Sequence, residues 1–230
     1  MSIREYLSVP VTKRPTFKKD MVEMVISLFI MSFGVVLSVK ACQGASPIAS
    51  FPNVISSVTD LSLGTTLFAT YAVFVVIQWI LIPDRARIIM TLTQLPFTMI
   101  FSGFVDLIEM AWGPWVATDL ATQWFLVIAS VFVIGFGVVL EIDANISLLA
   151  DDGLILAIHE VTKIPVSKVM ILFDVTFVAA AFILSWAVYH DFVGVGLGTI
   201  FAGITLGLSV KLFTKVVKGY IRKDGNVERE

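Results

Sequence analysis

Six stretches of about 20 apolar residues run along this chain, and a segment of that length and composition crosses a membrane as a helix. The bilayer core offers no water to backbone N–H and C=O groups, so each spanning segment must satisfy them internally. The six segments are Met21–Lys40, Thr65–Ile82, Ile88–Ala111, Ala121–Leu140, Lys168–Tyr189 and Phe192–Phe213. The sequence therefore predicts an all-α fold, a polytopic bundle of six transmembrane helices.

Composition agrees with a membrane protein. Hydrophobic residues make up 57% of the chain and charged residues only 15%, too few to cover a soluble domain. The net charge of -2 and the lack of an internal basic stripe argue against a nucleic-acid partner. One cysteine and two histidines exclude an internal disulfide and make a zinc site improbable. We expect the lipid bilayer as partner, and neither a metal nor any other cofactor.

Two further apolar stretches, Ala45–Val58 and Ile146–His159, are too short or too polar to span. The first contains two prolines, an asparagine and four serines, and the second is interrupted by Asp151, Asp152 and Gly153. Stretches of this length are more often re-entrant or buried in protein than spanning. The sequence predicts two broken or re-entrant segments, and the alternative is that both span, which makes eight crossings.

The distribution of basic residues favours six crossings. With a cytoplasmic N-terminus, fifteen of the sixteen Lys and Arg residues fall on the cytoplasmic side, and only Lys40 falls outside. This matches the positive-inside rule, whereas eight crossings would move Arg85 and Arg87 outside. We expect a cell-membrane protein, of bacterial origin, with both termini in the cytoplasm. The polar tails are residues 1–20 and 214–230.

The chain resembles itself at an offset of 103 residues. The nine residues from Phe29 to Leu37 align with those from Phe132 to Leu140, and six are identical. The alternative is chance similarity between apolar helices. The same offset also aligns the two short segments, residues 42–58 and 145–161. The sequence therefore predicts two repeats, residues 21–115 and 121–213.

Each repeat holds three crossings, an odd number, so the second must enter the membrane from the opposite side. Inverted repeats are characteristic of transporters, whose binding sites lie between the repeats near paired short or broken segments. We expect a small-solute transporter or permease-like protein whose solute is unknown. The alternative is a non-transporting membrane partner or scaffold that assists another complex.

Ionisable groups inside a membrane cost several kcal/mol and are candidates for function. Asp106 and Glu109 lie three residues apart and share one helix face, where they could bind a cation or exchange a proton; the alternative is a pair of interfacial charges. Asp174 lies about two turns into the fifth segment, which favours a buried or pathway-lining role. Lys40 ends the first segment and either binds a ligand or extends to the interface.

Uncharged polar side chains extend this candidate binding set. Pro96 should kink the third segment and leave a carbonyl free for Gln94, water or solute, or simply shape packing. In the first short segment, Ser46, Ser50 and Asn53 follow a flexible lead. A helix beginning near Ser46 could direct its N-terminal amides at an anion, or carry an ordinary N-capping serine.

No constellation indicates an enzyme, because the chain lacks a phosphate-binding loop, metal-ligand spacing or a nucleophile beside a base. We therefore expect no catalytic residues. His159 is more consistent with a solvated loop than with proton transfer. Five glycines along residues 194–207 permit close helix contact, within the chain or with a second copy or membrane partner.

Several motifs resemble the YczE/YyaS/YitT-type family of bacterial integral membrane proteins, with the YczE side closest. They lie in residues 32–47, 61–65, 152–160, 164–174 and 193–203. Many relatives carry Pro-Trp-Asp after the first glycine turn, where this chain has Pro47-Ile48-Ala49. The resemblance implies a multi-pass membrane protein, and it transfers no catalytic residue.

Overall fold

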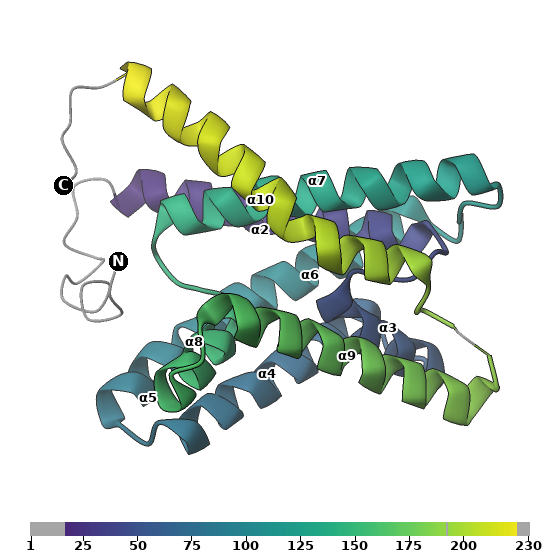
Figure 1. Cartoon of the computed structure of the whole chain (residues 1–230), viewed down its shortest axis with the longest axis horizontal. Helices are drawn as coiled ribbons and strands as arrows, with labels where there is room; N and C mark the ends of the chain where they lie inside the picture. The colour runs from purple at the N-terminus through teal and green to yellow at the C-terminus, as the bar shows by residue number, and fades with distance from the viewer. Residues whose placement is uncertain (1–16, 192, 225–230) are drawn as a thin grey trace.

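The computed structural model describes residues 17–191 and 193–224, and this part of the chain is helical, with no strand. Figure 1 shows the helices running mostly along one axis, as expected for a membrane bundle. The helices are α2 (Phe17–Lys40), α3 (Pro47–Thr59), α4 (Leu63–Leu81), α5 (Arg85–Leu92), α6 (Gln94–Trp112), α7 (Leu120–Ala144), α8 (Ala150–Thr162), α9 (Val166–Tyr189) and α10 (Leu197–Asp224).

Within the described residues, six helical segments are long and apolar enough to cross a membrane, which confirms the predicted class of fold. They are α2, α4, the continuous stretch Ile88–Trp112, α7, α9 and α10. We call the bundle end where α2 begins the N-face and the end where α2 stops the far face. A chain with six crossings is a multi-pass helical membrane protein.

The third crossing spans Ile88–Trp112 and is interrupted near Pro96, where the sequence predicted a kink. It consists of α5 and α6, which are separated at Thr93. Pro96 has no N–H to donate to the carbonyl of Leu92, and α5 stops at Leu92. The break therefore precedes the proline, and Pro96 occupies the first turn of α6, where a missing N–H costs nothing.

The two short segments are continuous helices of 13 residues, so they are not broken, and their re-entrant placement stays a prediction. Pro52 lies inside α3 without interrupting it. In α8 the residues taken as interruptions form the first turn, where Asp151 and Asp152 suit the positive end of the helix dipole. At 13 residues neither helix can span a bilayer.

The sixth crossing begins at Leu197, five residues later than predicted. The preceding glycines form a turn in which Gly194 has a φ of 77°, a conformation that favours glycine. Gly194 also accepts a 3.1 Å hydrogen bond from the backbone nitrogen of Ala45, just before α3. This segment joins α9 to α10 across the start of α3.

The offset of 103 residues recurs in the helix boundaries. The starts at Phe17, Pro47, Leu63 and Gln94 are each matched 103 residues later, at Leu120, Ala150, Val166 and Leu197. The left-handed residues after the helices repeat as well: Cys42 pairs with Asn145, and Asp60 pairs with Lys163. Among the helices described for residues 17–191 and 193–224, α5 alone has no counterpart at this offset.

The helices α2 and α7 cross at the centre of the bundle through glycines. A Cβ on Gly34 would lie 2.6 Å from Ile134 Cγ1 and 3.2 Å from the carbonyl oxygen of Ser130. A Cβ on Gly137 would meet the Met31 side chain and lie 3.2 Å from the carbonyl oxygen of Ser27. These two sets of neighbours are related by the same offset, so each helix makes the same contact with the other.

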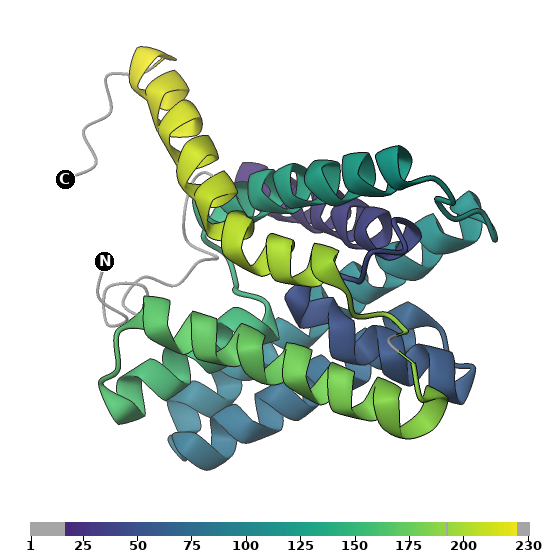
Figure 2. The same ribbon diagram turned by 45° about the vertical axis from the view of Figure 1, so that its right-hand side comes forward.

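The remaining packing is reciprocal too. The short helix α3 packs on α4 of its own half and on α9 of the other, while α8 packs on α9 and on α4. The outer helices α6 and α10 pack against α2 and α7 respectively. Figures 1 and 2 show α3 toward the far face and α8 toward the N-face.

Candidate functional site

The two short helices begin with the same contact. Their N-cap residues, Ser46 and Leu149, each donate a backbone N–H to a side chain eight residues earlier. Ser46 N donates to Ser38 Oγ at 3.0 Å, and Leu149 N donates to Glu141 Oε1 at 2.9 Å. The first half therefore has a hydroxyl where the second half has a carboxyl group, and the start of α8 carries the charge.

Glu141 is almost completely buried, with 1% of its surface exposed. Its first oxygen binds Leu149, and its second oxygen, Oε2, is buried without a hydrogen-bond partner. A buried carboxylate oxygen without a partner carries a large desolvation cost. The end of α7 thus places an unsatisfied acidic group beside the first turn of α8.

Three further carboxyl groups surround this point. Asp151 and Asp152 occupy the first turn of α8, and Asp174 lies half-buried on α9 within electrostatic range of both. Tyr71 of α4, only 1% exposed, donates its hydroxyl to Asp151 Oδ2 at 3.4 Å. We call Glu141, Asp151, Asp152 and Asp174 the carboxylate cluster.

The environment of α8 alters how its two aspartates titrate. Burial, and after it the neighbouring Asp151 and Asp174 carboxylates, raises the pKa of Asp152 to about 7. Burial raises the pKa of Asp151 to about 6, against the backbone amides of the first turn and the Tyr71 hydroxyl, which lower it. Both side chains therefore change charge near neutral pH.

A pair of glutamines closes the site on the side of α4 and α6. Gln78 Nε2 donates to Gln94 Oε1 at 3.0 Å and to the carbonyl oxygen of Ala150 at 3.1 Å. A Cβ on Gly153 would lie 2.5 Å from Gln94 Nε2 and 2.8 Å from Gln78 Oε1, so a side chain there would displace the two glutamine amides. Gln94, a candidate from the sequence, thus holds α8 in place together with Gln78.

The polar residues of α3 lie in a different setting. Ser50 is fully buried and donates to the carbonyl oxygen of Pro47 at 2.6 Å. Ser46 Oγ is buried and has no hydrogen-bond partner. Asn53 is half-buried, with its amide against Gly194. The start of α3 therefore presents one unsatisfied hydroxyl and no charge.

Near the far face, the two acidic residues of α6 have separate partners. Lys40 Nζ donates to the carbonyl oxygen of Gly113 at 2.7 Å and lies 3.9 Å from Glu109 Oε1. Asp106 accepts hydrogen bonds from Gly64 N at 2.7 Å and from Ser62 Oγ at 2.8 Å, and so caps the start of α4. These contacts give Lys40, Asp106 and Glu109 structural partners at that face.

His159, Gly196 and Gly198 have partners within the described part of the chain, whereas Gly207 does not. His159 Nδ1 lies at hydrogen-bond distance from the carbonyl oxygen of Ile164, at the end of α8. Gly196 and Gly198 pack against the backbone of Gln43, within the chain. Gly207 has no atom within 4 Å of an added Cβ and leaves an open position on α10.

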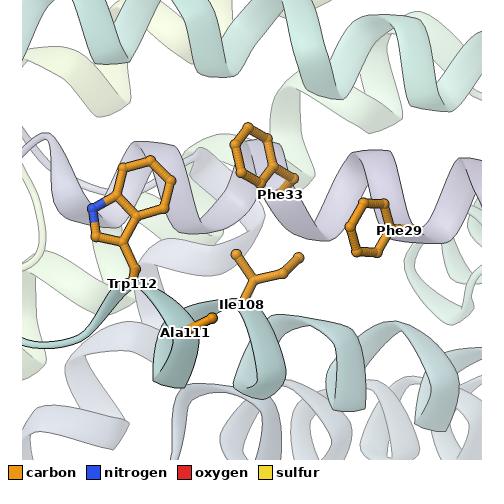
Figure 3. Close-up of a pocket in the computed structure, with 5 residues that line it drawn as sticks. All are labelled: Phe29, Phe33, Ile108, Ala111 and Trp112. Carbon is orange, nitrogen blue, oxygen red and sulfur yellow. The ribbon is translucent and has the colours of Figure 1, made fainter.

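An apolar groove lies between α2 and α6, apart from the carboxylate cluster. Figure 3 shows its side chains, which come from both helices and point toward one another. They are Phe29, Phe33, Ile108, Ala111 and Trp112. Because four of the five are pure hydrocarbons, this groove offers almost nothing to orient a polar solute.

Sequence reasoning missed Glu141, Tyr71 and Gln78. Glu141 ends an apolar segment and looks like an interfacial charge, while Tyr71 and Gln78 look like ordinary residues of a spanning helix. One signal was present: the offset of 103 pairs Glu141 with Ser38 and Tyr71 with Asp174. At both pairs of equivalent positions, the second repeat has an acidic residue where the first has a neutral one. Such positions mark where the chemistry of the two halves differs.

Comparison with known proteins gives a family and no named function. No curated protein matches the chain, and no solved structure matches it. The resemblance to YczE stays a prediction, since the matching family is described under another name. The model of a family of unknown function, DUF6198, matches residues 18–215, which is most of the chain, and the protein therefore belongs to that family.

Proposed function

We propose that this protein transports a small solute across the membrane through a site between two inverted repeats. The support is the recurrence of the 103-residue offset in helix starts, in left-handed residues and in the α2–α7 crossing. Three crossings in each half give the halves opposite orientations in the membrane. In transporters with inverted repeats, one repeat rocks against the other, and the binding site between them opens first to one side of the membrane and then to the other.

The observation that carries the proposal is the pair of short helices with unsatisfied polar atoms at their starts. Ser46 Oγ at the start of α3 and Glu141 Oε2 at the start of α8 are both buried without a partner. Non-helical backbone and free polar atoms inside a membrane protein are tolerated where they line a cavity or bind a ligand. The solute site accordingly lies where α3 and α8 begin.

An aromatic cluster beside this site would close it in the conformation described. Phe74 of α4 contacts Phe173 and Phe177 of α9, with ring centroids 5.3 and 5.2 Å apart. Phe177 also contacts Phe51 of α3. These rings join a helix from each repeat, so a rocking motion of the repeats would separate them and open a path.

The N-face is placed in the cytoplasm of a bacterial cell, because that orientation puts fifteen of the sixteen basic residues inside. In this orientation the cytoplasmic half of the bundle contains Asp151, Asp152 and Asp174. The ion pair of Lys40 and Glu109 then lies toward the outside. The site would be loaded or emptied on the cytoplasmic side through the region where α8 packs on α4 and α9.

The test is thermal stabilisation of the purified protein by a panel of amino acids, amines, organic acids, sugars and nucleosides. A solute that binds only the folded state at 100 times its Kd stabilises it by about 2.7 kcal/mol. We expect at least one class to raise the melting temperature, and Glu141→Gln to reduce that rise. The matched control is Asp60→Asn, an exposed residue between α3 and α4. A flat response across the panel would contradict the proposal.

A second candidate function is that of a membrane partner that assists another complex. It is favoured by α9 and α10, the least buried of the six spanning segments, and by the open position at Gly207. Small residues on a lipid-facing helix let a second helix approach closely. Photocrosslinking from a benzophenone maleimide attached to Gly207→Cys, in a Cys42→Ser background in native membranes, tests it, because a partner role predicts a specific protein adduct and lipid exposure alone predicts none.

A further inference from the structure

The carboxylate cluster brings four acidic groups together from three helices of the second repeat. Asp152 interacts electrostatically with Asp151 and Asp174, and Glu141 interacts with Asp152 and Asp151. Two of these side chains come from α8, one from α7 and one from α9. One helix dipole, the N–H of Leu149 and the first-turn donors to Asp151 include no positively charged group to offset four neighbouring negative charges.

The elements around the cluster supply no cation among the side chains described. From α4 it meets Tyr71 and Gln78, and from α6 Gln94, which are neutral at physiological pH. The helix α3, which also packs on α9, has no titratable residue between Pro47 and Thr59. The other charges of α8, His159 and Glu160, are two turns away at its opposite end.

The remaining charges of the neighbouring elements also lie elsewhere. The ion pair between Lys40 and Glu109 is at the far face, together with Asp106. Lys168 is exposed at the N-face end of α9, and Lys211 and Lys215 are both exposed on α10. Thus no described basic side chain is paired with the cluster.

Unpartnered oxygens indicate which ligand is missing. Glu141 Oε2 and Asp151 Oδ1 are buried and accept no hydrogen bond. Among the residues described, no group of three or more acidic, histidine or cysteine side chains has the arrangement to hold a metal ion. A proton satisfies a buried carboxylate oxygen, removes its charge and needs no cavity, so the geometry fits a proton best.

We propose that the carboxylate cluster is a proton-binding site and that it makes the proposed solute transport proton-coupled; the coupling rests on the proposed function. In uptake, an O–H bond forms on a cluster carboxylate, with the proton taken from hydronium at the N-face. In release, that bond breaks and water accepts the proton. The charge on α8 changes with each step, and its packing on α4 and α9 changes with it.

The titration of α8 supports this assignment. The pKa of Asp152 is raised to about 7 and that of Asp151 to about 6, first by burial. A site that exchanges protons in a cell needs a pKa near the working pH, which an ordinary exposed aspartate does not have. Asp152 is therefore the group expected to exchange first.

Infrared difference spectroscopy of the purified protein between pH 5 and pH 8 tests the proton site without any transport. We expect the folded wild type to lose a carboxylic acid C=O band with a midpoint near pH 7. Asp152→Asn should lose at least half of that change, and Asp152→Glu should retain a titrating band. Asp60→Asn, altered at an exposed site, should match the wild type.

Two outcomes would overturn the proton site: a wild-type spectrum without a titrating carboxylic acid, or an unchanged spectrum in folded Asp152→Asn. Folding of each variant is checked by tryptophan fluorescence and by a single peak in size-exclusion chromatography. The two proposals fail separately. A flat spectrum with solute binding refutes the proton site alone, whereas a titrating band without solute binding counts against the transporter.

Discussion

Replacing Gly137 with alanine tests whether the α2–α7 crossing is the centre of the fold. A Cβ at this position would meet the Met31 side chain and lie 3.1 Å from the backbone nitrogen of Met31. It would also lie 3.2 Å from the carbonyl oxygen of Ser27. Because two of these three atoms belong to the α2 backbone, a change of rotamer alone cannot make room, and the helices must separate.

The expected cost follows from that geometry. Overpacking a well-packed core typically costs about 1–3 kcal/mol. Alanine recovers up to about 1 kcal/mol of that through its better helix propensity than glycine. With full recovery the net loss against the wild type is about 0–2 kcal/mol. Against a glycine-to-alanine variant without the clash the loss is the full amount of about 1–3 kcal/mol, which lowers the melting temperature of a chain of this size by about 2–12 °C. Gly34→Ala should act in the same direction, since its Cβ would lie 3.0 Å from the backbone nitrogen of Ile134.

The assay is thermal unfolding in detergent micelles, followed by tryptophan fluorescence. The matched control is Gly103→Ala in α6, where an added Cβ has no atom within 4 Å and the residue is exposed. This variant should be neutral or slightly stabilising. Equal melting temperatures for the variants at Gly137 and Gly103 would refute the close crossing and, with it, the reciprocal packing of the two halves.

Three further predictions concern topology, access and pH. Reporter fusions at Trp115 and His190 should read outside and one at Arg87 inside; an outside signal at Arg87 would overturn the six-crossing topology. Cys42 is exposed at the far face, so an impermeant thiol reagent should label it in intact cells, and exclusive labelling from the cytoplasmic side would invert the orientation. The raised pKa of Asp152 means that the folded state retains a proton that the unfolded chain loses, so stability should fall as pH rises from about 4 to about 7. Asp152→Asn should flatten that fall in a series of melting curves, and an unchanged slope would contradict it.

The sequence predicted the architecture because apolar length and repeat spacing are local properties of a chain. Six spanning segments follow from composition, and the offset of 103 read from Phe29 to Leu37 recurs in the helix starts. What composition could not show is helix continuity. Pro52 and the Asp151–Gly153 run look like breaks in the sequence. In the structure α3 continues through Pro52, the acidic residues suit the first turn of α8, and Gly153 leaves space for the amides of Gln78 and Gln94.

The site was harder to predict, since it depends on contacts between residues far apart in the chain. The shared face of Asp106 and Glu109 suggested one joint site, yet the first caps α4 and the second lies beside Lys40. Asp174 was a candidate from the sequence, but its neighbours could not be predicted, because Asp151 lies on a different helix, α8. Glu141 is recognisable as part of the site only from the structure, in which its Oε1 accepts a hydrogen bond from the backbone nitrogen of Leu149.

Access to the start of α3 from both sides of the membrane tests the central claim most directly. Ala49 is fully buried there and is the counterpart of Asp152 at the 103-residue offset. The experiment uses a protein in which Cys42→Ser removes the natural cysteine and Ala49→Cys introduces a new one. Right-side-out and inside-out vesicles of this protein are each treated with an impermeant thiol reagent. The account predicts labelling from both sides, with the balance between the sides shifting from pH 5 to pH 8. Labelling from neither side, in vesicles where wild-type Cys42 reacts, would contradict transport between the repeats.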